Sequence, residues 1–261
     1  NRLKPFLHHC ISSNQSAFIP GKQIIDNIVI AHESIHCLNH RRIGSNEYMA
    51  LKLDMAKAYD RVDWPFVVKI MEKMGFCLIW INWIFKCMSS VGYSFNVNGE
   101  KKGWVRPSKG IRQGDPLSPY LFLLVSEGLS SLLKHALDNH CLTGLKIAKA
   151  SPAISHLFFA DDTLIFCRAS IEESKQVMKI LEMYEAAAGQ KINLDKSSIF
   201  FSKNTEMSNK AEILRILEGM KQVDQSKYLG LPMVIGRSKN QVFSYIKERV
   251  LGKLKGWKKN C

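Results

Sequence analysis

The sequence predicts an α+β fold in which an antiparallel sheet packs against helices, and three observations support this prediction. Short apolar runs of strand length lie at 48–55 and on both sides of Asp161-Asp162, within 155–167. Asn98-Gly99 lies between two further runs of this kind, and this dipeptide is typical of a tight β-hairpin. Longer segments with helix-capping signals separate the strands. With 261 residues, 46% of them hydrophobic, the chain can bury the core of one large domain or two small ones.

The first third of the chain predicts a helix followed by a strand. A helical run is expected from 24 to about 38, and an extended run from 48 to 55. Alternation along the extended run puts Leu51 and Leu53 on one face and Asp54 on the other. Asp54 is therefore expected at the end of a strand.

Two helices are expected next, and residue types define the boundaries of the first. Asp63 is a good N-cap, Pro65 fits the first turn, and Gly75 fits the position just past the end. A second, apolar helix is expected over 77–88. The β-hairpin around Asn98-Gly99 follows it.

The second half of the chain repeats this mixture of helices and short strands. Ser118 and Pro119 predict the start of a helix that reaches about Asp138. Ser170 with Glu173 predicts a capping box, for a helix that ends at Gly189. The remaining expected elements are a strand near 199–201, a helix near 211–217, a short apolar piece at 228–232 and a last helix from about Ser238.

Charge and cysteine usage restrict the functional class. The chain carries 37 Lys and Arg against 23 Asp and Glu, a formal net charge of +14. This excess favours a polyanionic partner such as nucleic acid, with a membrane surface as the alternative. Seven scattered cysteines without a Cys-x-x-Cys pair indicate neither a disulfide framework nor a zinc site. No apolar stretch is long enough to span a membrane and the start lacks a signal-peptide layout, so we expect an intracellular, soluble protein.

The adjacent aspartates are the strongest chemical signal in the sequence. Asp161-Asp162 is expected at the tip of a hairpin, where the pair could simply form the turn. Two neighbouring carboxylates repel, however, and a divalent cation between them would keep both ionised. If Asp54 comes from a neighbouring strand, three carboxylates face one point. Such a site suits Mg²⁺ and the two-metal chemistry of phosphoryl transfer.

Four runs of sequence resemble the successive motifs of reverse transcriptases, in order and in spacing. They are Lys52 to Asp60, Gly110 to Pro119, Phe159 to Asp162, and Gly189 to Ser197. The resemblance covers nearly the whole chain and is closest to non-LTR, LINE-type retrotransposon enzymes. Gln15 to Gly21 and Tyr228 to Pro232 give it a plant-like character.

The resemblance implies a right-hand polymerase palm, an antiparallel sheet packed on helices, with partial fingers and the stub of a thumb. The domains it implies are partial fingers at 1–47, a palm at 48–201 with a finger-like insertion at 73–108, and a palm-to-thumb connection with partial thumb at 202–261. Strands expected before residue 1, a fuller thumb and an endonuclease domain are absent from this sequence. We therefore expect a fragment truncated at both ends.

The resemblance also implies the catalytic residues. Asp54, Asp161 and Asp162 would be the ligands of two Mg²⁺ ions, with Mn²⁺ as a substitute. The ions would serve nucleotidyl transfer from a dNTP to a primer 3′-hydroxyl. A lysine of the last motif would protonate the departing pyrophosphate, and Lys196 suits this role better than Lys191, although the sequence does not decide between them.

Five further residues are expected to bind substrate. Tyr59 corresponds to the aromatic that stacks under the incoming sugar and excludes a 2′-hydroxyl; its alternative is a core aromatic. Gln113 and Gly114 correspond to the loop that touches the nascent base pair, where glycine allows a close approach of the backbone. Arg112 is either part of that loop's site or a solvated charge. Lys22 either contacts template or triphosphate or is a surface lysine.

The expected partners are an RNA template, a DNA primer and dNTPs, with a ribonucleoprotein formed on the element's own RNA and no membrane. Such a particle would be found in the nucleus and cytoplasm. Two other hypotheses stay open. One is a catalytically dead fragment that only binds nucleic acid, and the other is an RNA-templated RNA polymerase, which should lack a bulky residue at the position of Tyr59.

Overall fold

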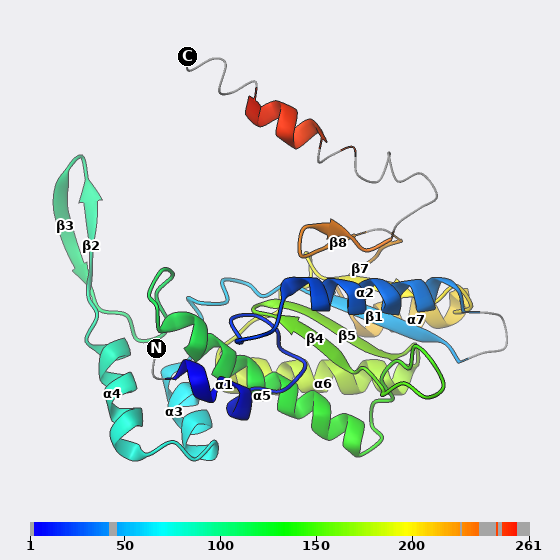
Figure 1. Cartoon of the computed structure of the whole chain (residues 1–261), viewed down its shortest axis with the longest axis horizontal. Helices are drawn as coiled ribbons and strands as arrows, with labels where there is room; N and C mark the ends of the chain where they lie inside the picture. The colour runs from blue at the N-terminus through cyan, green and yellow to red at the C-terminus, as the bar shows by residue number, and fades with distance from the viewer. Residues whose placement is uncertain (1–2, 42–45, 225, 235–243, 245–246, 255–261) are drawn as a thin grey trace.

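We describe the protein from a computed structural model that covers residues 3–41, 46–224, 226–234, 244 and 247–254 (Figure 1). The predicted α+β class is confirmed, with a mixed sheet of five strands in the order β4-β5-β1-β6-β7. Its strands are β1 (Tyr48–Leu53), β4 (His156–Phe159), β5 (Asp162–Arg168), β6 (Ser198–Phe201) and β7 (Lys221–Gln222). The helices are η1 (Lys4–Phe6), α1 (Leu7–Cys10), α2 (Ile24–Asn39), α3 (Trp64–Lys73), α4 (Leu78–Ser89), α5 (Ser118–Asp138), α6 (Ile171–Ala188) and α7 (Met207–Ile216).

β1 is the central strand of this sheet. It pairs antiparallel with β5 on one side and with β6 on the other, while β4 and β5 form an antiparallel hairpin. Only the short β7 is parallel, beside β6. The expected strand containing Lys52 and the hairpin containing Asp161 are therefore direct neighbours, although more than a hundred residues separate them along the chain.

Helices cover both faces of the sheet, which explains why β1 is buried on both sides (Figure 1). Met49, Leu51 and Leu53 belong to the main core, together with residues of α3, α5 and α6. Tyr48 and Ala50 point to the other face and belong to a second core built with α2. A strand with apolar residues at both alternations is expected only inside such a sandwich.

Capping side chains define the helix ends much as predicted, with one correction. The Asp63 carboxylate accepts a hydrogen bond from the Phe66 N–H at 3.1 Å, and the Ser170 hydroxyl accepts one from the Glu173 N–H at 3.2 Å. The second half of the predicted capping box is not made. The buried Glu173 carboxylate instead accepts from the N–H groups of Arg168 and Thr143, because these donors need a partner inside the fold.

Some boundaries differ from the prediction. β1 ends at Leu53 rather than at 55, because the chain beyond it bonds to the loop after α6 instead of continuing the ladder. α7 begins at Met207, four residues earlier than expected. The apolar piece at 228–232 forms a small hairpin of β8 (Lys227–Tyr228) and β9 (Leu231–Pro232). The predicted helix start at Ser238 lies outside the described residues, although 247–254 are helical.

A two-stranded ribbon stands apart from the body of the molecule (Figure 1). It consists of β2 (Tyr93–Val97) and β3 (Glu100–Val105), joined through Asn98 and Gly99 as predicted, and both strands are exposed along their whole length. α4 leads into it. Among the described residues, no helix is long and apolar enough to cross a membrane.

Candidate active site

The pairing of β1 with β5 brings two of the predicted aspartates together. The last pair of the ladder joins Leu53 to Thr163, so Asp54 directly follows this pair on one chain segment and Asp162 directly precedes it on the other. Alternation along both strands puts these two side chains on the α2 side of the sheet. Asp54 lies immediately past the end of its strand, as the sequence predicts.

The third aspartate lies in the turn between β4 and β5. Phe159 pairs with Asp162, so Ala160 and Asp161 form a two-residue turn and Asp162 is the first residue of β5. This corrects the expectation that both aspartates form the tip. Ala160 has a φ of +55°. A non-glycine residue in this left-handed region costs about 1 kcal/mol or more, and strain of this kind is concentrated at functional sites.

The surroundings of Asp162 disfavour its charged form. Burial raises the pKa of Asp162, the negative charge of Asp161 raises it further, and that of Asp54 adds to the effect. Lys52, two residues before Asp54 on β1, acts in the opposite direction. Asp54, Asp161 and Asp162 thus lie at one corner of the sheet, at the end of the β1–β5 ladder and in the turn before β5, and Lys52 is a basic residue on the same strand.

A loop from the fourth motif holds Asp54 by its backbone. The Asp54 N–H donates to the Ser197 hydroxyl at 3.1 Å, and the Asp54 carbonyl accepts from the Asn193 N–H at 2.8 Å. This loop also contains Lys191 and Lys196, both exposed. The two candidate proton donors therefore lie on the loop that wraps the first aspartate, and Ser197 is a positioning residue that sequence reasoning left unassigned.

Tyr59 lies between the core and the carboxylates. Its ring stacks on that of Phe122, with centroids 5.2 Å apart and an interplanar angle of 9°. The side chain is half-buried, and burial followed by the charge of Asp161 raises the pKa of its hydroxyl. The ring packs on the core and also lies near the charge of Asp161. A core aromatic and a residue under the incoming sugar are therefore compatible interpretations of Tyr59.

The loop of the second motif is fastened beside this tyrosine. The Ile111 N–H donates to the Tyr59 carbonyl at 2.9 Å. Gly110 has a φ of +88°, and a Cβ there would lie 2.7 Å from the Asp60 carbonyl oxygen, so only glycine fits. Beyond this anchor Arg112, Gln113 and Gly114 are exposed and Gly114 has a φ of +90°. The loop is therefore fixed at its base and accessible at its tip.

Lys22 is placed differently from the other candidate residues. Its ammonium group donates to the carbonyls of Ser13 at 2.8 Å and Gln15 at 2.7 Å. Burial lowers its pKa. In this conformation the lysine binds the loop that precedes it.

Two polar residues near the carboxylates were missed as site residues. The Asn27 amide of α2 donates to the Phe158 carbonyl at 2.8 Å and approaches the Tyr228 hydroxyl at 3.4 Å. Burial raises the pKa of Tyr228, and Asp162 contributes to the rise, so this ring lies near the second aspartate of the pair. Tyr228 was noticed in the sequence only as part of an apolar piece. A tyrosine flanked by turn residues could have been considered a site residue.

The oxygen atoms of the three aspartates suit a hard cation that completes its coordination shell with water and substrate. Within the described ranges, no three or more His, Cys, Asp or Glu side chains form a group that could hold a metal ion. Mg²⁺ commonly binds to one or two carboxylates and completes its shell with waters and substrate phosphates. Carboxylates are the ligands that such an ion takes, and Asp54, Asp161 and Asp162 are the candidates that would hold it together with water and substrate phosphates.

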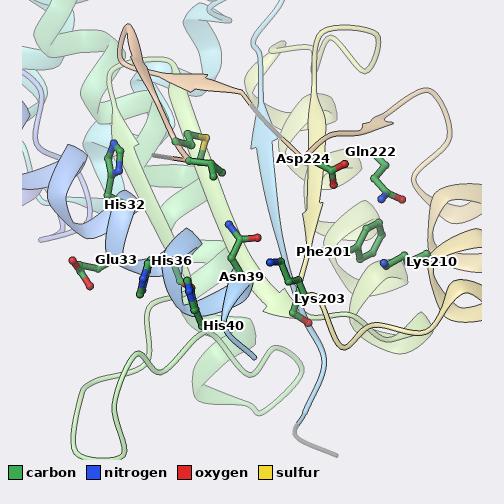
Figure 2. A pocket seen from close by; sticks show the side chains of 13 residues that line it. His32, Glu33, His36, Asn39, His40, Phe201, Lys203, Lys210, Gln222 and Asp224 are labelled. Carbon is green, nitrogen blue, oxygen red and sulfur yellow. The ribbon is translucent and has the colours of Figure 1, made fainter. Parts of the chain in front are cut away.

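A separate cavity of about 650 Å³ lies along α2, away from the turn (Figure 2). Histidines 32, 36 and 40 and Glu33 line it from the helix. Lys203, Lys210 and Asp224 face it from the other side, near β6 and β7. Its basic and acidic groups are mixed, which is not the pattern of a site for a polyanion, and it contains none of the predicted site residues.

Comparison with protein families gives one match over most of the chain. The model described as "Reverse transcriptase (RNA-dependent DNA polymerase)" matches residues 1–233. A protein of the transposon TX1 of Xenopus laevis is 27% identical over 98% of this chain and 19% of its own length. The Pol polyprotein of the retrotransposable element R2DM of Drosophila melanogaster is 27% identical over 83% of this chain and 20% of its own length.

Two further comparisons agree with this match. An uncharacterized mitochondrial protein of Arabidopsis thaliana is 54% identical over 26% of this chain and 57% of its own length. Among solved structures, telomerase from Candida tropicalis in complex with a fragment of telomeric RNA superposes with a TM-score of 0.58 at 10% identity, over 87% of this chain and 34% of that one. This likeness shows a shared fold.

The chain spans about a fifth of the length of its Xenopus and Drosophila relatives. Within that span it contains the strand, turn and loops that carry Asp54, Asp161 and Asp162. The predicted family is confirmed by the match over residues 1–233 and by relatives from retrotransposable elements. The chain belongs to the reverse transcriptase family, of the kind found in non-LTR retrotransposons.

Proposed function

We propose that this chain performs RNA-templated DNA synthesis, the transfer of a deoxynucleotide from a dNTP to a primer 3′-hydroxyl. The observation that supports the proposal is the antiparallel pairing of β1 with β5, which puts Asp54 and Asp162 at the same end of one ladder, with Asp161 in the turn before β5. Two Mg²⁺ ions, or Mn²⁺ in their place, would lower the pKa of the primer hydroxyl and neutralise charge on the leaving pyrophosphate. In this proposal the aspartates hold the reacting groups in line.

The neighbouring residues would select and orient the nucleotide. Tyr59, braced by Phe122 and close to Asp161, would lie under the incoming sugar and exclude a 2′-hydroxyl. Gln113 and Gly114 would touch the nascent base pair from the exposed end of their loop, with Arg112 beside them. Lys196 would protonate the pyrophosphate. Substituting Lys196 and Lys191 separately by alanine should slow single-turnover incorporation in only one of the two variants.

The template would meet the domains that precede and follow the sheet. We propose residues 1–47 as partial fingers, 48–201 as the palm with 73–108 as its insertion, and 202–261 as the connection to a partial thumb. All three long antiparallel pairings of the sheet fall within 48–201, which supports that division. The exposed β2–β3 ribbon belongs to the insertion, and its aromatic and basic side chains suit contact with nucleic acid.

The test is primer extension on a primed RNA template with dNTPs and Mg²⁺. The 261-residue chain should incorporate nucleotides, whereas Asp161→Asn should reduce incorporation to background while still binding the duplex. Equal activity in the variant would contradict the assignment. An RNA template bound in a salt-sensitive way without any incorporation would favour the second candidate, a non-catalytic nucleic-acid-binding fragment, which the +14 charge also supports.

A further inference from the structure

We propose that Gln15 is a positioning residue for the aspartate turn: its side-chain amide holds Ala160 in its left-handed conformation and thereby sets where Asp161 points. This inference rests on the proposed function for the role of Asp161, but the clamp itself is a matter of geometry. Gln15 precedes the four motifs, and nothing in its local sequence assigns it a role at the turn.

The loop that contains Gln15 runs along the outer edge of β4. The Phe158 N–H donates to the Asn14 carbonyl at 2.8 Å, and the Ser16 N–H donates to the Phe158 carbonyl at 3.1 Å. Gln15 lies between these bonds and forms a parallel bridge with Phe158. The loop thus acts as an extra edge strand, which ends beside the turn.

The Gln15 amide is fully buried and directed at Ala160. Its Oε1 atom accepts from the Ala160 N–H at 3.1 Å and from the N–H groups of Ser16 at 3.0 Å and Ala17 at 2.9 Å. Its Nε2 group makes a longer contact of 3.5 Å with the Ala160 carbonyl. One side chain therefore joins the loop to both backbone polar groups of the residue whose φ is +55°.

Several other contacts keep the loop itself from moving. Lys22 donates to the Gln15 carbonyl at 2.7 Å, and the Ser16 hydroxyl donates to the Asn27 amide oxygen at 2.7 Å. The Ser12 N–H donates to the Glu127 carboxylate of α5 at 3.0 Å. The first of these contacts shows that the Lys22 ammonium group helps to hold the loop. Because contacts with α2 and α5 hold the loop, they also fix the position from which Gln15 bonds to the turn.

The geometry explains why an alanine can occupy position 160. Alanine disfavours a positive φ, and a free two-residue turn would relax toward other conformations. Because a buried amide oxygen satisfies the Ala160 N–H only in the observed conformation, the clamp selects it. Asp161 is the next residue along the chain, so the same contact sets the direction of its carboxylate.

The experiment measures the conformation of the turn and the affinity for a metal ion separately, both in the 261-residue chain. Hydrogen exchange of the Ala160 amide, followed by NMR, reports the clamp without any metal. Mn²⁺ binding, followed by electron paramagnetic resonance titration, reports the position of Asp161. Gln15→Met keeps the volume but removes all four side-chain hydrogen bonds, the two with Ala160 and those from the N–H groups of Ser16 and Ala17. Asn14→Ala is the matched control, since it removes a 2.8 Å bond from the same loop to the His156 carbonyl of the same strand.

We expect Gln15→Met to speed exchange at Ala160 at least tenfold and to weaken Mn²⁺ binding at least fivefold, with Asn14→Ala within twofold of wild type in both. Should Gln15→Met not fold, Gln15→Asn, which is one methylene too short to reach Ala160, must show the same two changes. An unchanged exchange rate, or an equal effect of Asn14→Ala, would overturn the clamp.

A second substitution separates positioning from general loss of stability. Glycine adopts a positive φ without strain, so in an Ala160→Gly background Gln15→Met should change Mn²⁺ affinity by less than twofold. A fivefold loss in that background as well would assign Gln15 a purely structural role. If the wild-type chain binds no Mn²⁺ at all, the proposed function fails, and exchange at Ala160 still decides whether the clamp exists.

Discussion

The aspartate corner and the β2–β3 ribbon show opposite ways of using the same kind of element, an antiparallel hairpin. In the corner, β4 and β5 are almost wholly buried and side chains from distant segments bond to their turn. In the ribbon, every residue is exposed and the turn depends on Asn98-Gly99 alone. The first arrangement fixes the position of the turn, and the second leaves its side chains exposed to solvent.

The two hairpins differ in whether the residues of the turn are enough to determine its conformation. Asn98 and Gly99 both have positive φ, which their residue types favour, so the ribbon needs no support from elsewhere. Ala160 has a positive φ that its residue type disfavours, and it therefore depends on tertiary contacts. We expect substitutions in the corner to affect chemistry and folding, and substitutions in the ribbon to affect binding only.

The largest effect that would sharpen this contrast is expected at Asp54. Asp54→Asn keeps the size of the side chain but removes one of two facing charges, and incorporation should fall by about 10³-fold or more, as for loss of a group that acts in the transition state. Single-turnover primer extension measures it. Asp138→Asn, an exposed position at the far end of α5, serves as the control and should retain wild-type rates.

The next largest effect is the acid sensitivity of the corner. Burial lowers the pKa of His156 to about 4, and its ring nitrogens bond to the hydroxyls of Ser130 and Ser155, both at 2.9 Å. The folded state keeps the ring neutral while the unfolded chain takes up a proton below about pH 6.5. The free energy of unfolding should therefore fall by about 3 kcal/mol as the pH drops from 6.5 to 4.

Urea denaturation at several pH values measures this loss. In His156→Gln the part of the loss that comes from this ring should disappear, although the variant should be less stable at pH 7 because its hydrogen bonds change. A decline between pH 6.5 and 4 that is as steep in the variant as in wild type would show that other groups cause it.

A smaller effect is expected for nucleotide selection at Tyr59. Tyr59→Ala removes the ring that is stacked on Phe122 near Asp161, so the preference for dNTP over rNTP should fall by about ten- to a hundredfold, the range of discrimination by pocket size. Competition between dNTP and rNTP in the extension assay gives the ratio. Tyr59→Phe keeps the ring and should keep the preference, and a preference unaffected by loss of the ring would exclude the proposed gate.

The smallest effect tests the ribbon. Trp104 is 67% exposed, and its ring is held against Gly92, where a Cβ would lie 2.1 Å away. Trp104→Ala should weaken binding to single-stranded RNA roughly fivefold, the lower end of what stacking on one base contributes, and leave the melting temperature unchanged. Fluorescence anisotropy measures it, with Phe6→Ala as an exposed aromatic control outside the ribbon. If Trp104→Ala lowered the melting temperature and left RNA binding unchanged, the ribbon would have a structural role, and it would not differ from the β4–β5 hairpin in the way described.

Much of the fold could be predicted from local residue patterns. The capping residues Asp63 and Ser170 are where the pattern put them, and so is the turn at Asn98-Gly99, because each depends on a few neighbouring residues. Only the return bond of the capping box, from the Ser170 N–H to the Glu173 carboxylate, was predicted wrongly, since that carboxylate binds donors from other segments. The same limit applies to Tyr228 and Asn27, whose place beside the carboxylates depends on how α2 and β8 pack.

By itself the sequence predicted which residues would have the chemistry: the three aspartates, the aromatic five positions after the first, and the glycines that let their loops turn. Only the tertiary structure decided that Asp54 and Asp162 lie at the same end of the β1–β5 ladder, since strand order and register come from burying both faces of β1. It also decided that a glutamine near the start of the chain holds the turn at Ala160. The physical reason is that a residue's chemistry is a local property, whereas the burial and hydrogen bonds that aim it come from segments far apart along the chain.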